Sequence, residues 1–369
     1  MRRNTERRNT HPRPADNSRH GPLRRLLGSL GPGVVTGAAD DDPSGIATYS
    51  ITGAQFGTSF LWAALLTWPL MAAVQSMCAR IGMVTGRGLG SALGTKFPRP
   101  ALLLITFALF VANTINIGAD LAGMADGAEL ITGVPTLVWV AVFGGVIAWV
   151  TIELRYVVIA SALKWLALVL FVYVVVAIHL GPDWGSVLHD TVIPSIPQGK
   201  EGWQTLVAIL GTTISPYLFF WQASQEVEEE KSIGRRRVVD RIGATDAEIR
   251  ARDFDVATGT FFSNLVMFFI ILATAMTLHK NGITHPSTSR EVANALTPIA
   301  GRFATLLYTV GLIGTGALAI PTLGGSAAYA FAETFGCVRG WTNNSSARAR
   351  FTACSRSRSS LVFAFPSST

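Results

Sequence analysis

Charged residues and cysteine are scarce in this 369-residue chain. Only 14% of its residues are Asp, Glu, Lys or Arg, against about 25% in a typical soluble domain, while 49% are hydrophobic. Its three cysteines have neither metal-site nor disulfide spacing. The sequence also lacks a His-Glu-x-x-His zinc motif, a Gly-x-Ser-x-Gly turn and a phosphate-binding loop. We therefore expect that the chain is not an enzyme.

Long apolar runs take the place of these features, and several reach the roughly 20 residues that a membrane helix needs. They predict an all-α, polytopic membrane protein with about eight spans, at 30–53, 59–82, 101–124, 134–152, 157–180, 204–229, 256–279 and 301–333. The predicted organisation is a disordered basic tail at 1–28, a transmembrane domain at 29–336 and an aberrant or disordered Ser/Arg-rich tail at 337–369. The charged segment 230–255 is expected to contain a short helix.

Positive charge is distributed unevenly along this predicted topology. With a cytoplasmic N-terminus, 25 of the 30 Lys and Arg residues fall in cytoplasmic segments and four fall outside. Such a bias is typical of multi-pass proteins of the cell membrane. It explains the net charge of +7 without nucleic acid, so the lipid bilayer is the expected partner. The sequence leaves the oligomeric state open.

Three consecutive acids, Asp40, Asp41 and Asp42, interrupt the first span just before Pro43, Ser44 and Gly45. One acid at the bilayer centre costs roughly 2.5–3.5 kcal/mol on insertion scales. The three acids must therefore face protein, water or a cation. The proline break, placed at 42–45, also leaves backbone carbonyls without helical partners. Acids beside such carbonyls predict a cation site.

A second break, near Ser215 and Pro216, follows a Gly/Thr-rich half-helix in the sixth span. Five spans separate the two breaks, so the broken helices run in opposite directions. This pattern is typical of inverted-repeat transporters with a site between two broken helices. The first repeat is predicted at 29–181, and an incomplete second repeat at 203–336.

Asp42 is the best candidate ligand, because it lies at the break itself. Carbonyl oxygens around Ala39 and around 211–213 are expected to be free for a metal, and hydroxyls of Ser44, Thr212 and Ser215 add further oxygen. Gly45 leaves room for water on the ion. Hard oxygen ligands favour Mg²⁺, Ca²⁺ or Mn²⁺ over Cu⁺ or Zn²⁺.

Other polar residues in the spans have further predicted roles. Asp120 follows Asn113 and Asn116 at helical spacing. It is either a second position on the ion or proton path or a polar contact between helices. Asp40 and Asp41 are expected to tune the field or to face a vestibule.

The residues from Gly31 to Gly45, together with Ile214-Ser215-Pro216-Tyr217, resemble the Nramp divalent metal transporters. The resemblance is greatest to the magnesium-transporting branch and covers about 21–336. It implies a LeuT-like fold and makes Asp42 the metal-ligating acid. The positions of the family's ligating Asn, Met and carbonyl-donating Ala are occupied by Gly45, Ser215 and Thr212. Loss of the Met thioether favours Mg²⁺.

The resemblance also bears on proton coupling. Asp120 matches a family acid, but the acid's Glu partner is Gly123 here, and two family histidines are replaced by Tyr217 and Gln222. No imidazole remains to titrate near neutral pH, so weak or absent coupling is expected. The candidates for an ion or proton pathway are Asp41, Asn116, Asp120, Tyr217 and Gln222. No cofactor is expected beyond the transported Mg²⁺ or Mn²⁺.

Family members have ten or more spans, whereas eight are predicted here. We therefore expect a C-terminally truncated chain whose site is open on one side. Two alternatives stay open. One is a sodium-coupled organic solute transporter of the same fold, which three acids at the first break disfavour because such sites bind an anionic group there. The other is an inactive, truncated membrane protein.

Overall fold

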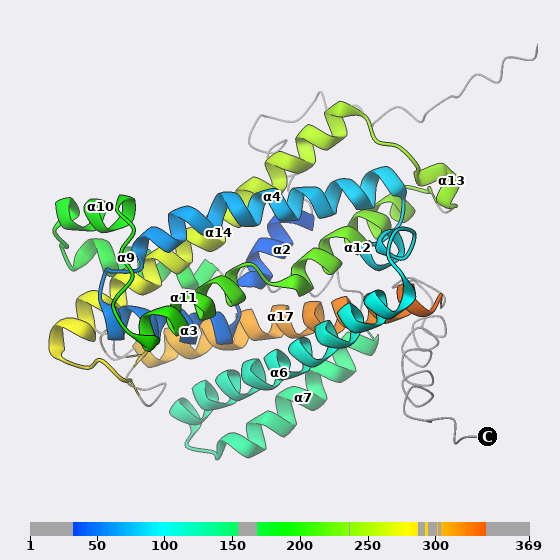
Figure 1. Cartoon of the computed structure of the whole chain (residues 1–369). Coiled ribbons are helices and arrows are strands. Elements are labelled where there is room, and N and C mark those ends of the chain that lie inside the picture. The colour runs from blue at the N-terminus through cyan, green and yellow to red at the C-terminus, as the bar shows by residue number, and fades with distance from the viewer. Residues whose placement is uncertain are drawn as a thin grey trace, which may run out of the picture.

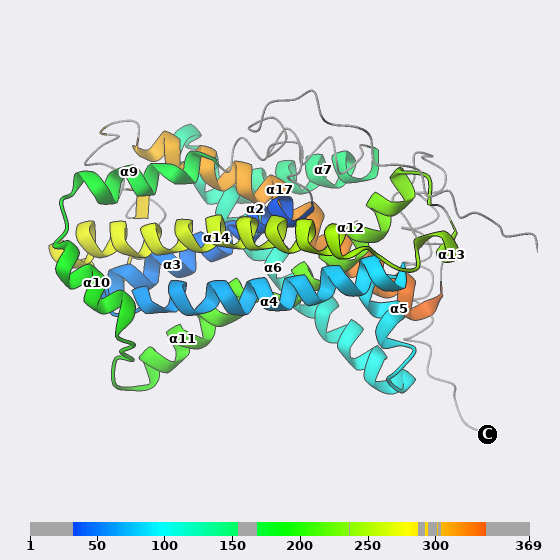
Figure 2. The ribbon, with the colours of Figure 1, turned by 90° about the horizontal axis from the view of Figure 1, so that it is seen from above.

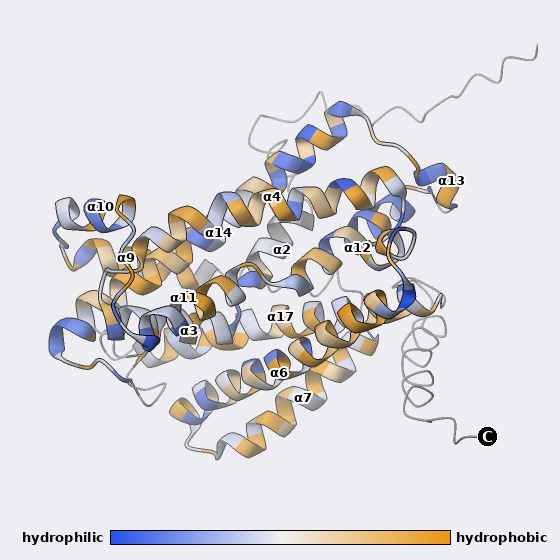
Figure 3. Ribbon diagram, viewed as in Figure 1, coloured by the Kyte–Doolittle hydropathy of each residue, from blue (hydrophilic) through white to orange (hydrophobic). Residues whose placement is uncertain are grey.

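The computed structural model describes residues 32–153, 168–235, 237–286, 292–293, 301 and 304–336. Within these ranges every regular element is a helix, which confirms the all-α prediction. Six of the helices are long and apolar enough to cross a membrane, and Figure 3 shows hydrophobic residues along most of their length. The chain is therefore a membrane protein. The tails predicted at 1–28 and 337–369 lie outside the described residues.

The helices follow the order of the predicted spans. The N-terminal half contains α2 (Pro32–Asp40), α3 (Pro43–Phe56), α4 (Leu61–Thr85), α5 (Leu89–Leu93), α6 (Arg99–Thr132) and α7 (Thr136–Glu153). The remainder contains η1 (Leu168–Phe171), α9 (Val172–His179), α10 (Trp184–Val192), α11 (Lys200–Thr213), α12 (Pro216–Ser232), α13 (Val238–Arg241), α14 (Asp246–Thr277), η2 (His279–Asn281) and α17 (Ala304–Phe335).

Two predicted boundaries need correction. The first break lies at Asp41 and Asp42, not at 42–45, because Pro43 begins α3. Proline suits a first helical position, where its missing N–H has no partner to lose. The seventh span starts ten residues earlier than predicted, since a capping box between Thr245 and Glu248 begins α14 directly after the short helix α13.

The long helices pack into two groups (Figures 1 and 2). In the first group, α14 packs against α2, α3, α4 and α9. In the second, α6 packs against α7 and α17. Helix α12 contacts α4 on one side and α17 on the other, so it lies at the seam between the groups. A cluster of buried side chains fills this seam and includes Met71, Leu218, Ala223 and Leu323.

Small residues let α2 approach α14 closely. A Cβ atom on Gly37 would lie 2.5 Å from the backbone carbonyl carbon of Gly259, well inside van der Waals contact. Lipid tails are as apolar as a helix surface, so close packing rather than water exclusion holds membrane helices together. The position of α2, and with it the first break, depends on this contact.

We predict that Gly37→Ala lowers stability by about 1–3 kcal/mol, the typical cost of overpacking. The matched control is Gly118→Ala in α6, where nothing lies within 4 Å of the added Cβ. There the change is expected to be neutral or slightly stabilising, since alanine favours helix. Thermal unfolding in detergent measures both variants. Equal melting temperatures for the two would contradict the packing of α2 on α14.

Candidate metal site

The first break is organised by the carboxylate of Asp42. This residue has extended backbone angles (φ −74°, ψ 166°) and caps the N-terminus of α3, where its Oδ1 accepts from Gly45 N at 2.6 Å. Side-chain caps of this kind satisfy backbone N–H groups that have no helical partner. A Cβ on residue 45 would meet Asp42 Oδ1 at 3.2 Å, so glycine fits this crowded turn. Asp42 is buried, with 2% of its surface exposed.

Helix α6 supplies the next layer around the break. Asn116 Nδ2 donates to Asp42 Oδ2 at 3.0 Å, and the buried Asp120 accepts from Ser44 N at 3.1 Å. The Ser44 hydroxyl lies 2.7 Å from Asp42 Oδ1 and 2.9 Å from Asn116 Oδ1, and its single hydrogen can serve only one of them at a time. Asp120 therefore does make the polar helix contact, while its role on an ion path stays a prediction.

The second break lies at Ile214 and Ser215, between α11 and α12, as predicted. Ser215 Oγ lies 2.9 Å from Gly211 O and 2.8 Å from Thr212 O, to which it donates. The prediction that both carbonyls are free is therefore wrong for this conformation. The hydroxyl folds back onto the preceding turn, where its single hydrogen satisfies one of the two carbonyls at a time.

One side chain joins the two breaks. Tyr217 Oη, in the first turn of α12, donates to Ala39 O at 3.1 Å in the last turn of α2. The Ala39 carbonyl, also predicted to be free, is thus occupied. Beside it, Tyr49 of α3 and Thr213 of α11 share a hydrogen bond of 3.2 Å between their hydroxyls. The broken helices are linked through groups that a metal would compete for.

A pocket of about 580 Å³ reaches this region between α6, α11, α12 and α17. Its polar lining includes four of the predicted residues: Asn116, Thr212, Ser215 and Tyr217. The rest of the lining is mainly apolar, and no Met, Cys or His side chain contributes to it. The pocket therefore places hydroxyl and carbonyl oxygens near Asn116, the residue that hydrogen-bonds to Asp42.

Asp40 and Asp41 face a different neighbour. Ser263 Oγ on α14 lies 2.7 Å from Asp40 Oδ2 and 3.3 Å from Asp41 Oδ1. Among the residues that the structure describes, no three His, Cys, Asp or Glu side chains are grouped to hold a metal. A cation at Asp42 would thus rely mainly on neutral oxygens. Sequence reasoning missed Ser263, because a single hydroxyl in an apolar run carries no distinctive signal.

Gln222 lies further along α12, in a polar network that the sequence did not reveal. Gln222 Nε2 donates to Glu226 Oε1 at 2.7 Å, and Arg252 of α14 pairs with Glu226 at 3.0 Å and with Asp255 at 2.9 Å. Asp255 also accepts from Gly33 N at 2.8 Å. The network ties the start of α2 to α12 and α14, and a pathway role for Gln222 stays a prediction.

Two broken helices linked to each other within a bundle of long apolar helices define a broken-helix transporter fold. The chain belongs to the Nramp family: the sequence profile of that family, described as natural resistance-associated macrophage protein-like, matches residues 33–368. Family membership confirms the predicted fold class and the expectation that the chain is not an enzyme.

Curated relatives include two proteins named divalent metal cation transporter MntH. The protein from Deinococcus radiodurans is 26% identical over 305 residues, covering 80% of this chain and 66% of its own length. The protein from Yersinia pestis (strain Pestoides F) is 28% identical over 316 residues, covering 82% and 72%. The chain thus spans about two thirds to three quarters of the length of these relatives.

Solved structures support the fold alone. The manganese transporter of Eremococcus coleocola, in complex with an aromatic bis-isothiourea compound, matches with a TM-score of 0.69 and 16% identity, over 93% of this chain and 71% of that one. Mhp1, a nucleobase-cation-symport-1 family transporter, matches with a TM-score of 0.57 and 15% identity, over 91% and 72%.

We predict that Tyr217→Phe destabilises the protein by about 1–3 kcal/mol, because it leaves the buried carbonyl of Ala39 without a donor. Thr114→Val is the control: it also removes one hydroxyl, but from an exposed side chain that bonds only within its own helix, to Phe110 O. Chemical unfolding in detergent compares them. If Tyr217→Phe lowers the free energy of unfolding no more than Thr114→Val does, the link between the two breaks is refuted.

Proposed function

We propose that the chain transports divalent metal cations, Mg²⁺ or Mn²⁺, across the cell membrane, with weak or no coupling to protons. The observation that carries this proposal is the buried carboxylate of Asp42 at a helix break. It is bonded to Asn116, which with Thr212, Ser215 and Tyr217 forms the polar part of the pocket. A buried acid costs several kcal/mol unless it is paired, and a divalent cation is the partner that suits it.

The proposed ligands are Asp42, the carbonyls of Ala39 and Thr212, and the hydroxyl of Ser215. The expected room for water at Gly45 is not supported in this crowded turn, where a Cβ would lie 3.2 Å from Asp42 Oδ1. In the described conformation the proposed ligands bond to one another or to Tyr217, Ser44 and Asn116. A hydrogen bond between neutral groups contributes only about 0.5–1.5 kcal/mol net, and one to a charged group about 1.5–3 kcal/mol. A cation that approaches from the pocket can therefore displace such donors and take their place.

The chemistry of these groups favours a hard ion. Carboxylate, carbonyl, hydroxyl and water suit Mg²⁺ and Mn²⁺, whereas thiolate and thioether ligands select softer metals. The pocket has no sulfur or imidazole lining. The names of the relatives support divalent metals in general and, for the Eremococcus coleocola protein, manganese.

Orientation follows from the two ends of the bundle. Figure 1 shows α13 and α12's C-terminal part at one end, and α10 with the end of α14 at the other. The α13 end carries Arg87, Arg235 and Arg241, and the α10 end carries Lys280. By the positive-inside rule, we propose that the α13 end faces the cytoplasm, and with it the start of α2, where Gly33 N bonds to Asp255 near the start of α14.

The positions of the histidines support weak coupling of transport to protons. The described part of the chain contains His179, His189, His279 and His285, in or next to α9, α10 and η2. None of them lines the pocket at the breaks. With no imidazole at this pocket, the membrane potential is the proposed driving force.

We predict that Asp42→Asn lowers Mg²⁺ and Mn²⁺ uptake into liposomes by more than about 100-fold, beyond the 10–100-fold typical of groups outside the ligand shell. Asparagine keeps the volume and the helix cap, but loses the charge. The control is Asp40→Asn, two residues away, which makes the same substitution at a carboxylate held by Ser263. This variant is expected to retain uptake. If Asp42→Asn transports as well as wild type, the proposed site is wrong.

A second prediction concerns driving force. The membrane potential contributes about 2.3 kcal/mol per elementary charge per 100 mV, and twice that for a divalent ion. Uptake is therefore expected to rise steeply when a potassium gradient makes the liposome interior negative, while a trapped pH dye shows no acidification beyond that of empty vesicles. Acidification that tracks metal entry in fixed proportion would establish coupling instead.

A further inference from the structure

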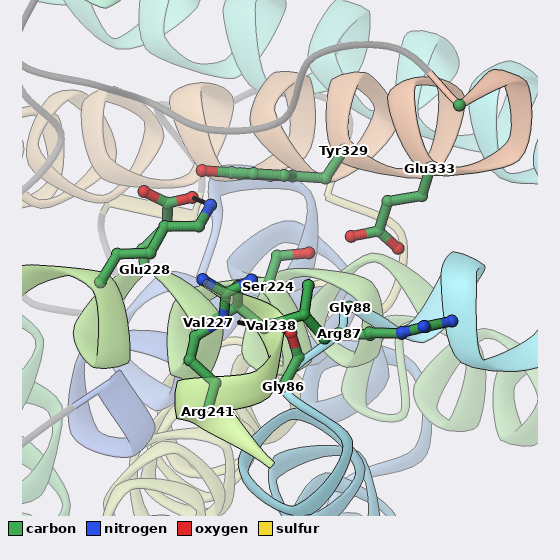
Figure 4. A pocket seen from close by; sticks show the side chains of 12 residues that line it. Gly86, Arg87, Gly88, Ser224, Val227, Glu228, Val238, Arg241, Tyr329 and Glu333 are labelled. Carbon is green, nitrogen blue, oxygen red and sulfur yellow. Dashed lines mark hydrogen bonds and ion pairs between the residues drawn. The ribbon is translucent and has the colours of Figure 1, made fainter. Parts of the chain in front are cut away.

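A second pocket lies at the α13 end, away from the breaks. It encloses about 380 Å³ and lies between the loop that follows α4, the C-terminal half of α12, α13 and the end of α17 (Figure 4). The side chains with polar or charged groups that line it are Arg87, Ser224, Glu228, Lys231, Arg241, Tyr329 and Glu333. Nothing in the proposed transport site uses these residues.

The pocket sits on the seam between the two helix groups. Helix α12 packs against α4, while α17 packs against α6, and both α12 and α17 supply lining residues. A ligand held here would contact both groups at once. A relative movement of the groups at this end would therefore change the shape of the pocket.

Both acids of the pocket are already occupied. Glu228 Oε1 accepts from Lys231 Nζ at 2.6 Å, and Glu333 Oε2 accepts from Ser91 N at 3.0 Å at the start of α5. Because three basic side chains share the lining with these two acids, a cation is disfavoured and the pocket carries a net positive charge.

Arg241 is fixed in the wall by neutral groups. Its guanidinium donates to the backbone carbonyls of Gly86 at 3.3 Å and of Arg235 at 3.1 Å. These bonds hold the loop after α4 against α13. They orient the side chain without adding a negative charge of their own.

Two donors remain for a ligand. Ser224 is only 2% exposed, and its Oγ has no hydrogen-bond partner; Figure 4 shows the hydroxyl pointing into the pocket. A buried hydroxyl without a partner is costly. Arg87 is exposed at the rim, and no ion pair to it occurs within the described ranges. Its guanidinium lies on the same side of the pocket as Glu333 (Figure 4).

We propose that this pocket binds a phosphate ester anion, which takes hydrogen bonds from Ser224 and charge from Arg87. Guanidinium groups bind phosphate oxygens in pairs, and a hydroxyl adds a further donor. Basic pockets between membrane helices on the cytoplasmic side suit lipid head groups, and a soluble phosphate ester offers the same chemistry. A bound anion would hold the seam closed; this consequence for transport rests on the proposed function, whereas binding itself does not.

The test is binding to the purified full chain in neutral detergent, without divalent metal. One arm titrates inorganic phosphate and the other short-chain phosphatidylglycerol, and each follows the melting temperature. We expect saturable stabilisation by at least one probe. Arg87→Gln, at an exposed position, and Ser224→Ala, which removes one buried oxygen, are each expected to weaken apparent affinity at least about tenfold, the value of one charge-assisted hydrogen bond.

The control is Arg250→Gln, which removes an exposed positive charge from α14 outside the pocket and is expected to leave affinity unchanged. Saturation by phosphatidylglycerol alone assigns the site to a lipid. Saturation by phosphate alone assigns it to a soluble phosphate ester, and saturation by both shows that the site accepts either. The proposal is overturned if neither probe saturates, or if Arg87→Gln and Ser224→Ala bind as tightly as Arg250→Gln. This binding assay contains no divalent metal, so its result does not depend on the transport proposal, which the liposome uptake of metal tests separately.

Discussion

The rest of the structure depends on how one buried carboxylate is satisfied. Asp42 ends the interruption of the first span, caps α3 through Gly45 N and accepts from the Ser44 hydroxyl and from Asn116 on α6. A buried charge without partners would cost several kcal/mol. The same three donors that offset this cost therefore determine where α3 begins and how α6 lies across it. Because the donors are neutral, none of them takes the place of a cation as a charge partner for Asp42.

A second constraint follows from the first. The two interrupted helices are joined by Tyr217 to Ala39 and by Tyr49 to Thr213, and α2 is held at its other end by Asp255 to Gly33 N. Metal binding at the breaks would compete with the first of these bonds, while the last lies near the proposed cytoplasmic end. A change at the site can thus alter how firmly α2 is held on α12 and α14. Under the proposed function, these hydrogen bonds would connect metal binding at the breaks to the position of α2.

Much of the fold was predictable, because proline and helical periodicity leave local signals. Pro43 and Pro216 located both breaks to within a few residues, and the spacing of Asn113, Asn116 and Asp120 placed them on one face of α6, where Asn113 and Asp120 are buried. The site was predicted less completely. Hydroxyls of Ser215 and Tyr217 donate to carbonyls that we expected to be free, and Ser263 meets Asp40 across more than 200 residues of sequence. Such contacts depend on the tertiary packing of several helices, which no local pattern encodes.

The most direct test of the account is to locate the metal. Crystals of the chain grown with Mn²⁺ give an anomalous scattering signal that marks each bound ion. We expect one strong peak at bonding distance from the Asp42 carboxylate, on the side of Thr212 and Ser215, with the Asn116 amide displaced. A peak between Asp40 and Asp41 beside Ser263, with Asp42 still held by its three donors, would contradict the central claim.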